Sequence, residues 1–131
     1  MSQTRTKIYF AIKSEDQNID QKTIAQYIHL NPTKFELMYA RGLIPKCTIW
    51  EYAIPEFTSW DIETELNELI LKLSTYEEGL KRLKNDWKVD FVIQIVLRIG
   101  EETPSLHFGS IVTDFVSKVG AQIDCDIYNE K

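Results

Sequence analysis

A long run of alternating side chains, from Val89 to Ile99, places the strongest constraint on the fold. Every second position in this run is apolar, namely Val89, Phe91, Ile93, Ile95, Leu97 and Ile99. The intervening positions hold Asp90, Val92, Gln94, Val96 and Arg98. Successive side chains of a strand point to opposite faces, so one face of this segment must be buried along its whole length. The run predicts a long central strand.

Three further segments have the pattern of strands, and four have the pattern of helices. The expected strands are Lys7 to Lys13, Lys46 to Ile54 and Ala121 to Tyr128. The expected helices are Asp20 to Leu30, Asp61 to Ser74, Ser74 to Trp87, and a last helix around Ile111 to Val119 that closes at Gly120. The segment from Thr33 to Pro45 is expected to be irregular, with a short strand before the Arg41-Gly42 turn.

Two capping signals divide the helical middle of the chain. Thr58 with Asp61 and Ser74 with Glu77 have the spacing of a capping box. Each pair precedes a stripe of apolar residues at helical spacing. We therefore expect two helices that meet at Ser74 in a bend.

The order of these segments predicts the fold class. Strand, helix, strand, two helices, strand, helix and strand follow one another, and the first and last thirds echo each other as β-α-β units. Two such units can share one antiparallel-rich sheet covered by helices, as in a ferredoxin-like or related sandwich. We expect one α+β domain over residues 1–131.

Composition and charge exclude several classes of protein. The apolar fraction of 44% and the charged fraction of 27% are those of an ordinary globular chain. A net charge of -5 disfavours a nucleic-acid partner, which would need clustered Lys and Arg. No apolar run reaches the ~20 residues of a membrane span, and the first residues lack a signal-peptide pattern. We expect a cytoplasmic protein in which Cys47 and Cys125 are reduced.

The sequence contains no motif with known chemistry. No dinucleotide fingerprint, Walker A loop, Cys-x-x-Cys, His-Glu-x-x-His or nucleophile elbow occurs, so no cofactor is expected. The remaining candidates are Asp124 and Asp126, which stand two residues apart and so share one face of a strand. With His107 or Asp90 nearby they would form a cation site or an acid-base pair. The alternative is that they only protect an exposed strand edge.

Aromatic residues are the candidates for contact with a partner. Trp50 and Trp60 border the loop from Pro55 to Ser59, and Tyr128 ends the last strand. Aromatic side chains are enriched at the centres of interfaces, although most aromatic residues at regular spacing belong to the core. We take Trp50, Trp60 and Tyr128 as candidate partner-binding residues.

Several of these patterns together resemble one family. They are Leu30-Asn31-Pro32-Thr33 after a helix, Trp50 in a strand, Trp60-Asp61 before the helix with Leu66, Leu69 and Leu73, and the ending from Gly120 to Tyr128. From about Ile8 to Tyr128 the chain resembles the bacterial DUF4279 family. The resemblance implies small bacterial proteins without an agreed activity, some with gene neighbourhoods suggestive of toxin immunity, and no catalytic residues. Met38 to Gly42 departs from the simple polar turn expected there.

Three functions follow as hypotheses. The first is a non-catalytic interaction module, including an immunity-type protein that binds a toxin, which requires an exposed acidic patch with aromatic residues. The alternative is a small-molecule-binding regulatory domain, which requires a concave pocket. The third is a metal-dependent enzyme, which requires Asp124, Asp126 and His107 close together. The sequence leaves homo-oligomerisation open.

Overall fold

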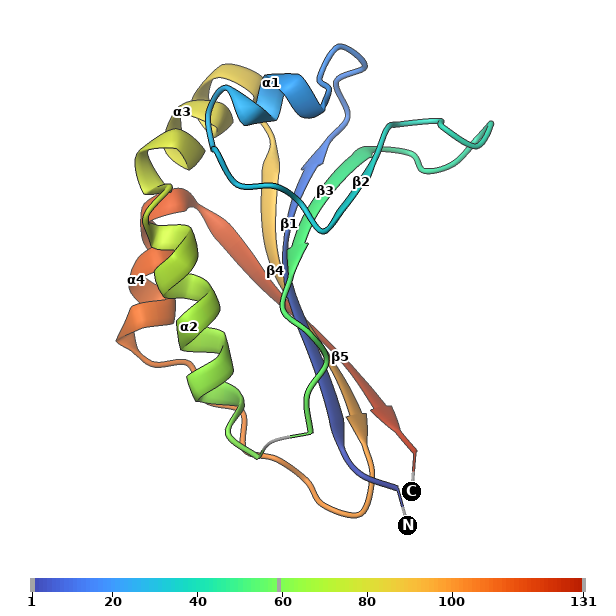
Figure 1. Ribbon diagram of the computed structural model, residues 1–131, viewed down its shortest axis with the longest axis vertical. Coiled ribbons are helices and arrows are strands. Elements are labelled where there is room, and N and C mark those ends of the chain that lie inside the picture. The colour runs from blue at the N-terminus through green and yellow to red at the C-terminus, as the bar shows by residue number, and fades with distance from the viewer. Residues whose placement is uncertain (1, 59, 131) are drawn as a thin grey trace.

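A five-stranded open sheet forms the centre of the protein (Figure 1). The computed structural model describes residues 2–58 and 60–130. The strands are β1 (Arg5–Ser14), β2 (Lys34–Glu36), β3 (Thr48–Ala53), β4 (Asp90–Ile99) and β5 (Ala121–Asn129), in the order β2-β3-β1-β4-β5. Neighbouring strands are antiparallel except for β4 and β5, which are parallel. The long strand expected from Val89 to Ile99 is confirmed as β4.

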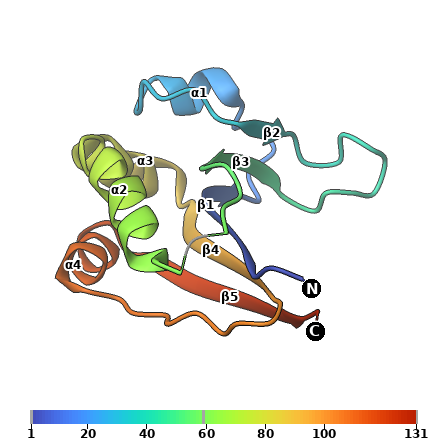
Figure 2. The same ribbon diagram turned by 60° about the horizontal axis from the view of Figure 1, so that its bottom comes forward.

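Four helices lie on one side of this sheet (Figures 1 and 2). They are α1 (Gln21–Ala25), α2 (Ile62–Ser74), α3 (Glu77–Trp87) and α4 (Ser110–Val119). The apolar rows of the strands face the helices, and the two layers bury the core between them. Phe10 lies at its centre, with its ring 5.5 Å from Phe91 and 6.0 Å from Phe115.

The caps of α2 and α3 differ from the predicted ones, although the two helices and the bend between them are confirmed. Asp61, not Thr58, caps α2, because its carboxylate accepts a hydrogen bond from the Thr64 N–H at 3.0 Å. Ser74 does not cap α3; its hydroxyl donates to the Ile70 carbonyl at 2.8 Å, inside α2. Tyr76 is the residue before α3, and its side chain makes no capping bond.

The first helix is shorter than predicted. It ends at Ala25 rather than Leu30, and the chain continues in a turn through Gln26 and Tyr27. This turn presses against Gly79 in α3, where a Cβ atom would clash with the carbonyl oxygen of Tyr27. Packing of this backbone against α3 therefore overrides the helical spacing of the apolar residues.

The α+β class and the helix-covered, mostly antiparallel sheet are confirmed, but the two β-α-β units are not alike. The last third is a direct unit, in which α4 joins the adjacent parallel strands β4 and β5. In the first third, the expected partner strands β1 and β3 are antiparallel. The strand parallel to β1 is the short β2, with β3 between them. The fifth strand also extends the sheet beyond a four-stranded ferredoxin-like arrangement.

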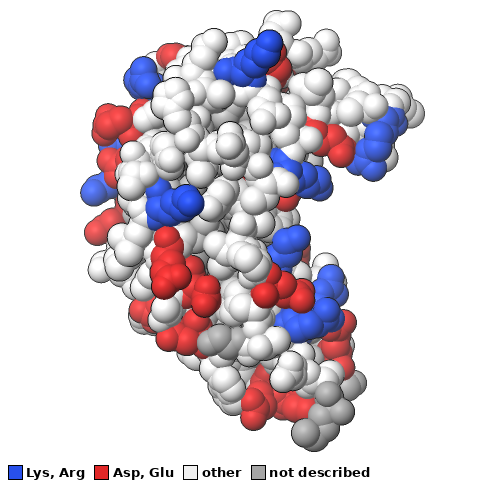
Figure 3. Space-filling view, in the orientation of Figure 1, with Lys and Arg blue, Asp and Glu red and all other residues white. Residues whose placement is uncertain are grey.

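In the part of the chain that the structure describes, no helix or strand covers the face of the sheet opposite the helices (Figure 1). Figure 3 shows that the molecule is hollowed on this side, below the projecting connection between β2 and β3. Over the residues described, no helix is both long and apolar enough to span a bilayer.

Candidate functional site

The three residues considered for a metal or acid-base site are not brought together. Asp124 and Asp126 point outward from β5, and the Asp126 carboxylate accepts a hydrogen bond from the Gln94 amide at 3.1 Å. His107 lies in the loop before α4, with its Nε2 atom 3.9 Å from a carboxylate oxygen of Glu63 in α2. Within residues 2–58 and 60–130, no three His, Cys, Asp or Glu side chains are grouped to hold a metal. The sequence hypothesis failed because the sheet separates its helical side from the outward side of β5.

Trp50 is a core residue, so the prediction that it contacts a partner is wrong. Its side chain is 1% exposed and meets the Phe10 ring edge-on at 6.4 Å. β3 pairs with β1 at Trp50 and Ile12, and this position faces the helices. The surface location expected from the neighbouring loop does not apply to a residue in the middle of an interior strand.

Tyr128 lies at the surface near the end of β5. It is 46% exposed, and its ring lies 4.8 Å from the Arg98 guanidinium, a cation–π contact. The outward position of Tyr128 agrees with the alternation of the strand. Its availability to a partner stays a prediction.

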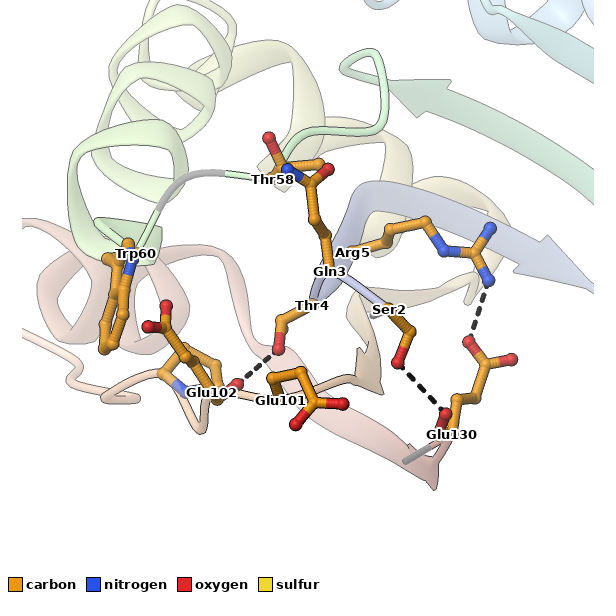
Figure 4. A pocket seen from close by; sticks show the side chains of 10 residues that line it. Ser2, Gln3, Thr4, Arg5, Thr58, Trp60, Glu101, Glu102 and Glu130 are labelled. Carbon is orange, nitrogen blue, oxygen red and sulfur yellow. Dashed lines mark hydrogen bonds and ion pairs between the residues drawn. The ribbon is translucent and has the colours of Figure 1, made fainter.

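Trp60 is 60% exposed and lines a groove at the end of the sheet (Figure 4). The groove has a volume of about 680 Å³. Four segments far apart in the chain form it: the N-terminal segment, the segment before α2, the loop after β4 and the C-terminal end. Its lining residues are Ser2, Gln3, Thr4, Arg5, Thr58, Trp60, Glu101, Glu102, Pro104 and Glu130.

Hydrogen bonds to the N-terminal segment fix one wall of the groove. The Thr4 hydroxyl donates to the Glu102 carbonyl and accepts from the Gly100 N–H at 3.0 Å. The Glu101 N–H donates to the Ser2 carbonyl at 3.0 Å. A side chain at position 100 would clash with the Ser2 backbone, so glycine permits this close approach. The loop that carries both glutamates is therefore held in place.

The opposite wall is held by a β-bridge. The Thr6 N–H donates to the Phe57 carbonyl at 2.8 Å, and the Phe57 N–H donates to the Thr6 carbonyl at 3.0 Å. This bridge ties Phe57 onto the start of β1.

The groove carries excess negative charge. One guanidinium, that of Arg5, lines it, and this group lies 2.8 Å from Glu130 and 3.9 Å from Glu56. The hydrogen bond with Glu130 raises the pKa of Arg5 above its usual value. The positive charge of Arg5 is therefore balanced by its own partners. Glu101 and Glu102, which are both exposed, then make the rest of the groove negative.

An exposed indole beside carboxylates suits a cationic group. In Figure 4, the carboxylate of Glu102 extends toward the Trp60 ring. The Glu101 side chain, in contrast, extends away from the ring. A Lys or Arg side chain over the indole face would be attracted by the ring electrons and by the Glu102 carboxylate together. The sequence pointed to Trp60 but missed Glu101 and Glu102. Their adjacency after Gly100 was visible in the sequence, whereas their place in one groove with Trp60 depends on the fold.

Comparison with known proteins identifies one family. The family model described as "Domain of unknown function (DUF4279)" matches residues 3–130, nearly the whole chain. No curated protein and no solved structure matches the chain.

Proposed function

Since this chain belongs to the DUF4279 family, described as a domain of unknown function, we propose that it is a non-catalytic binding protein whose acidic groove takes up a basic segment of a protein partner. The observation that carries the proposal is the groove in which exposed Trp60 stands with Glu101 and Glu102. This is the acidic surface with an aromatic residue that an interaction module requires.

The groove suits a side chain better than a free ion. Cation–π contacts contribute about 0.5–1 kcal/mol at exposed sites and about 2 kcal/mol when desolvated. Pairing with exposed carboxylates adds a contribution that salt screens. A partner segment with Lys or Arg therefore gains from the indole and from the glutamates at once.

The net charge of -5 supports a basic partner, because long-range attraction speeds encounter between proteins of opposite charge. The specific form of this proposal is an immunity-type protein that binds a toxin, as the family resemblance implies for some members, and the acidic charge suits a toxin that is basic. It requires that the partner present a basic segment able to enter the groove.

The test is titration of the protein with a short lysine-rich peptide, measured by calorimetry at low salt. The Trp60→Ala variant is expected to bind about fivefold more weakly, while Trp60→Phe keeps most of the affinity because an aromatic face remains. The double variant Glu101→Gln/Glu102→Gln is also expected to bind several-fold more weakly. Acetylation of every lysine of the peptide should abolish binding.

A matched control removes the same charge elsewhere. Glu15→Gln/Glu68→Gln neutralises two exposed glutamates outside the groove. This variant is expected to bind the peptide nearly as well as the unchanged protein. If it loses as much affinity as Glu101→Gln/Glu102→Gln, the peptide responds only to net charge and the groove is not the site.

The alternative of a small-molecule-binding domain is favoured by one observation, the groove volume of about 680 Å³, which lies in the usual range for ligand pockets. Titration with lysine amide in place of the peptide distinguishes the two functions. Tight binding of lysine amide alone would favour the small-molecule function, whereas binding only of the peptide favours the protein partner.

A further inference from the structure

The outer edge of β5 is a long strand edge. β5 is the last strand of the sheet, and all nine of its residues pair with β4 on the inner side. Within residues 2–58 and 60–130, no backbone hydrogen bond joins β5 to any other segment, including the loop that leads to α4 and is seen near β5 in Figure 2. Because backbone groups of a strand point alternately to its two sides, every second residue from Ala121 to Tyr128 offers an N–H and a C=O to another chain.

The opposite edge of the sheet offers much less backbone. It is formed by β2, which spans only the three residues from Lys34 to Glu36. Very short edge strands are one of the ways in which proteins avoid pairing with other chains. The length of β5 provides no such protection, so its side chains must decide which chains can pair with it.

The side chains of β5 form two rows of different chemistry. The row on the open face of the sheet is polar and exposed, and it consists of Gln122, Asp124, Asp126 and Tyr128. The row on the helical side is apolar and consists of Ala121, Ile123, Cys125 and Ile127. Ile127 is 59% exposed, although it belongs to this apolar row. A strand beside β5 would therefore meet an acidic row on one side and an apolar row on the other.

The carboxylates of Asp124 and Asp126 have no basic partner in the chain itself. Their neighbours on β4 are the neutral residues Gln94 and Val96, and the Gln94 amide donates to Asp126 at 3.1 Å. Over the part of the chain that the structure describes, neither carboxylate takes part in a salt bridge. Both negative charges are thus available to a basic side chain of another protein.

We propose that β5 accepts an extended segment of a protein partner as a sixth strand, and that this segment alternates basic with apolar residues. Main-chain hydrogen bonds to β5 supply affinity, and the alternating side chains supply specificity. Lys or Arg side chains of the segment lie opposite Asp124 and Asp126, because cross-strand pairs of opposite charge are stabilising. Its apolar side chains lie beside Ile123 and Ile127 on the helical side.

A second copy of this chain does not suit the same edge. β5 contains no Lys or Arg, so the β5 strand of another copy has no basic side chain to offer. In an antiparallel pairing of two β5 strands centred on Cys125, Asp124 of one copy would lie opposite Asp126 of the other. Like charges directly opposite on paired strands are destabilising. The carboxylates that keep two copies of β5 apart are the ones that attract a basic strand.

This edge is a different surface from the acidic groove. The residues that line the groove include none of β5, although Glu130, which follows β5 directly, is one of them. A segment paired with β5 can therefore continue toward the groove. The edge does not depend on the groove, and each of the two sites is tested by its own variants.

The experiment adds the peptide Lys-Val-Lys-Val-Lys-Val-Lys to the full chain at low salt and follows amide hydrogen exchange by NMR. Binding should slow exchange at alternate residues of β5, those whose N–H points away from β4. The control peptide Lys-Lys-Lys-Lys-Val-Val-Val has the same composition and charge but no alternation. It should leave these amides unprotected. This comparison uses the unchanged protein and so does not depend on the folding of a variant.

A charge swap then tests the acidic row. Asp124→Lys/Asp126→Lys should bind the lysine-valine peptide about tenfold more weakly or worse, and it should gain binding of Glu-Val-Glu-Val-Glu-Val-Glu. Glu15→Lys/Glu68→Lys changes the net charge equally at exposed positions outside β5. This control should keep the alternating protection of β5 by the lysine-valine peptide and should not bind the glutamate-valine peptide.

The outcomes separate this proposal from the groove. Trp60→Ala should leave the protection of β5 unchanged even where it weakens binding in the groove. Three results would overturn the proposal: no protection of β5 at saturating lysine-valine peptide, equal protection by the control peptide, or failure of the Asp124→Lys/Asp126→Lys variant to bind the glutamate-valine peptide while its circular dichroism spectrum is unchanged.

Discussion

Gly79 shows how one residue fixes the contact between distant segments. Glycine in the interior of a helix is normally unfavourable by about 1 kcal/mol relative to alanine. In α3, however, Gly79 is buried against the backbone of Tyr27, and a Cβ atom would clash with the Tyr27 carbonyl. The absence of a side chain allows the turn after α1 to lie directly on α3.

We predict that Gly79→Ala destabilises the protein by about 1–3 kcal/mol, because overpacking outweighs the better helix propensity of alanine. The measurement is urea unfolding followed by circular dichroism. Asn85→Ala, at an exposed position of the same helix, is the control and should be neutral or slightly stabilising. An increase in stability for Gly79→Ala would show that the contact with Tyr27 is looser than described.

Trp50 and Trp60 illustrate how much the neighbours of a residue decide. Trp50 precedes the loop that starts at Pro55, and Trp60 follows it. Trp50 is nevertheless 1% exposed and Trp60 60% exposed. The alternation of β3 places Trp50 on the row with Thr48, which is also buried. Trp60 lies just before α2 and belongs to no strand or helix, so no alternation predicts which way its side chain points. Its side chain lines the open groove and is therefore exposed.

At the level of elements, α2 shows the agreement between periodicity and burial. The apolar stripe predicted for this helix is Ile62, Leu66, Leu69, Ile70 and Leu73, and each of these side chains is at most 1% exposed. Leu71 does not belong to the stripe and is 54% exposed. The same residue type thus occupies both faces of one helix.

Leu66, which is buried, and Leu71, which is exposed, lie on opposite faces of α2 and allow a matched prediction. Leu66→Ala should cost about 2–5 kcal/mol in the free energy of unfolding, because it leaves a cavity in the core. Leu71→Ala should change that free energy by less than about 0.5 kcal/mol. Denaturant unfolding of the two variants at one pH checks both values, and similar costs for both would contradict the assigned orientation of α2.

At the scale of the whole molecule, the position of each strand in the sheet should set its resistance to opening. β1 lies in the middle of the sheet and pairs with β3 and β4 along most of its length. β2 is an edge strand of three residues, and the connection to β3, residues 37–47, follows it directly. Local opening requires least energy where few buried contacts and few paired strands hold the backbone.

We therefore predict that the amides of β1 and β4 exchange with deuterium most slowly and those of residues 37–47 most rapidly. Mass spectrometry of peptides after timed exchange measures this order. Exchange in β1 as fast as in β2 would contradict its central place in the sheet.

The sequence by itself determined the strands β1, β3, β4 and β5, the apolar stripe of α2, the bend before α3 and the α+β class, because each follows from periodicity within a short segment. Only the tertiary structure decided the end of α1 at Ala25, the antiparallel pairing of β1 with β3, and the groove that Trp60 shares with Glu101 and Glu102. These depend on contacts between residues far apart in the chain. A local pattern of side chains records which face is apolar, but it does not record which distant segment will cover that face.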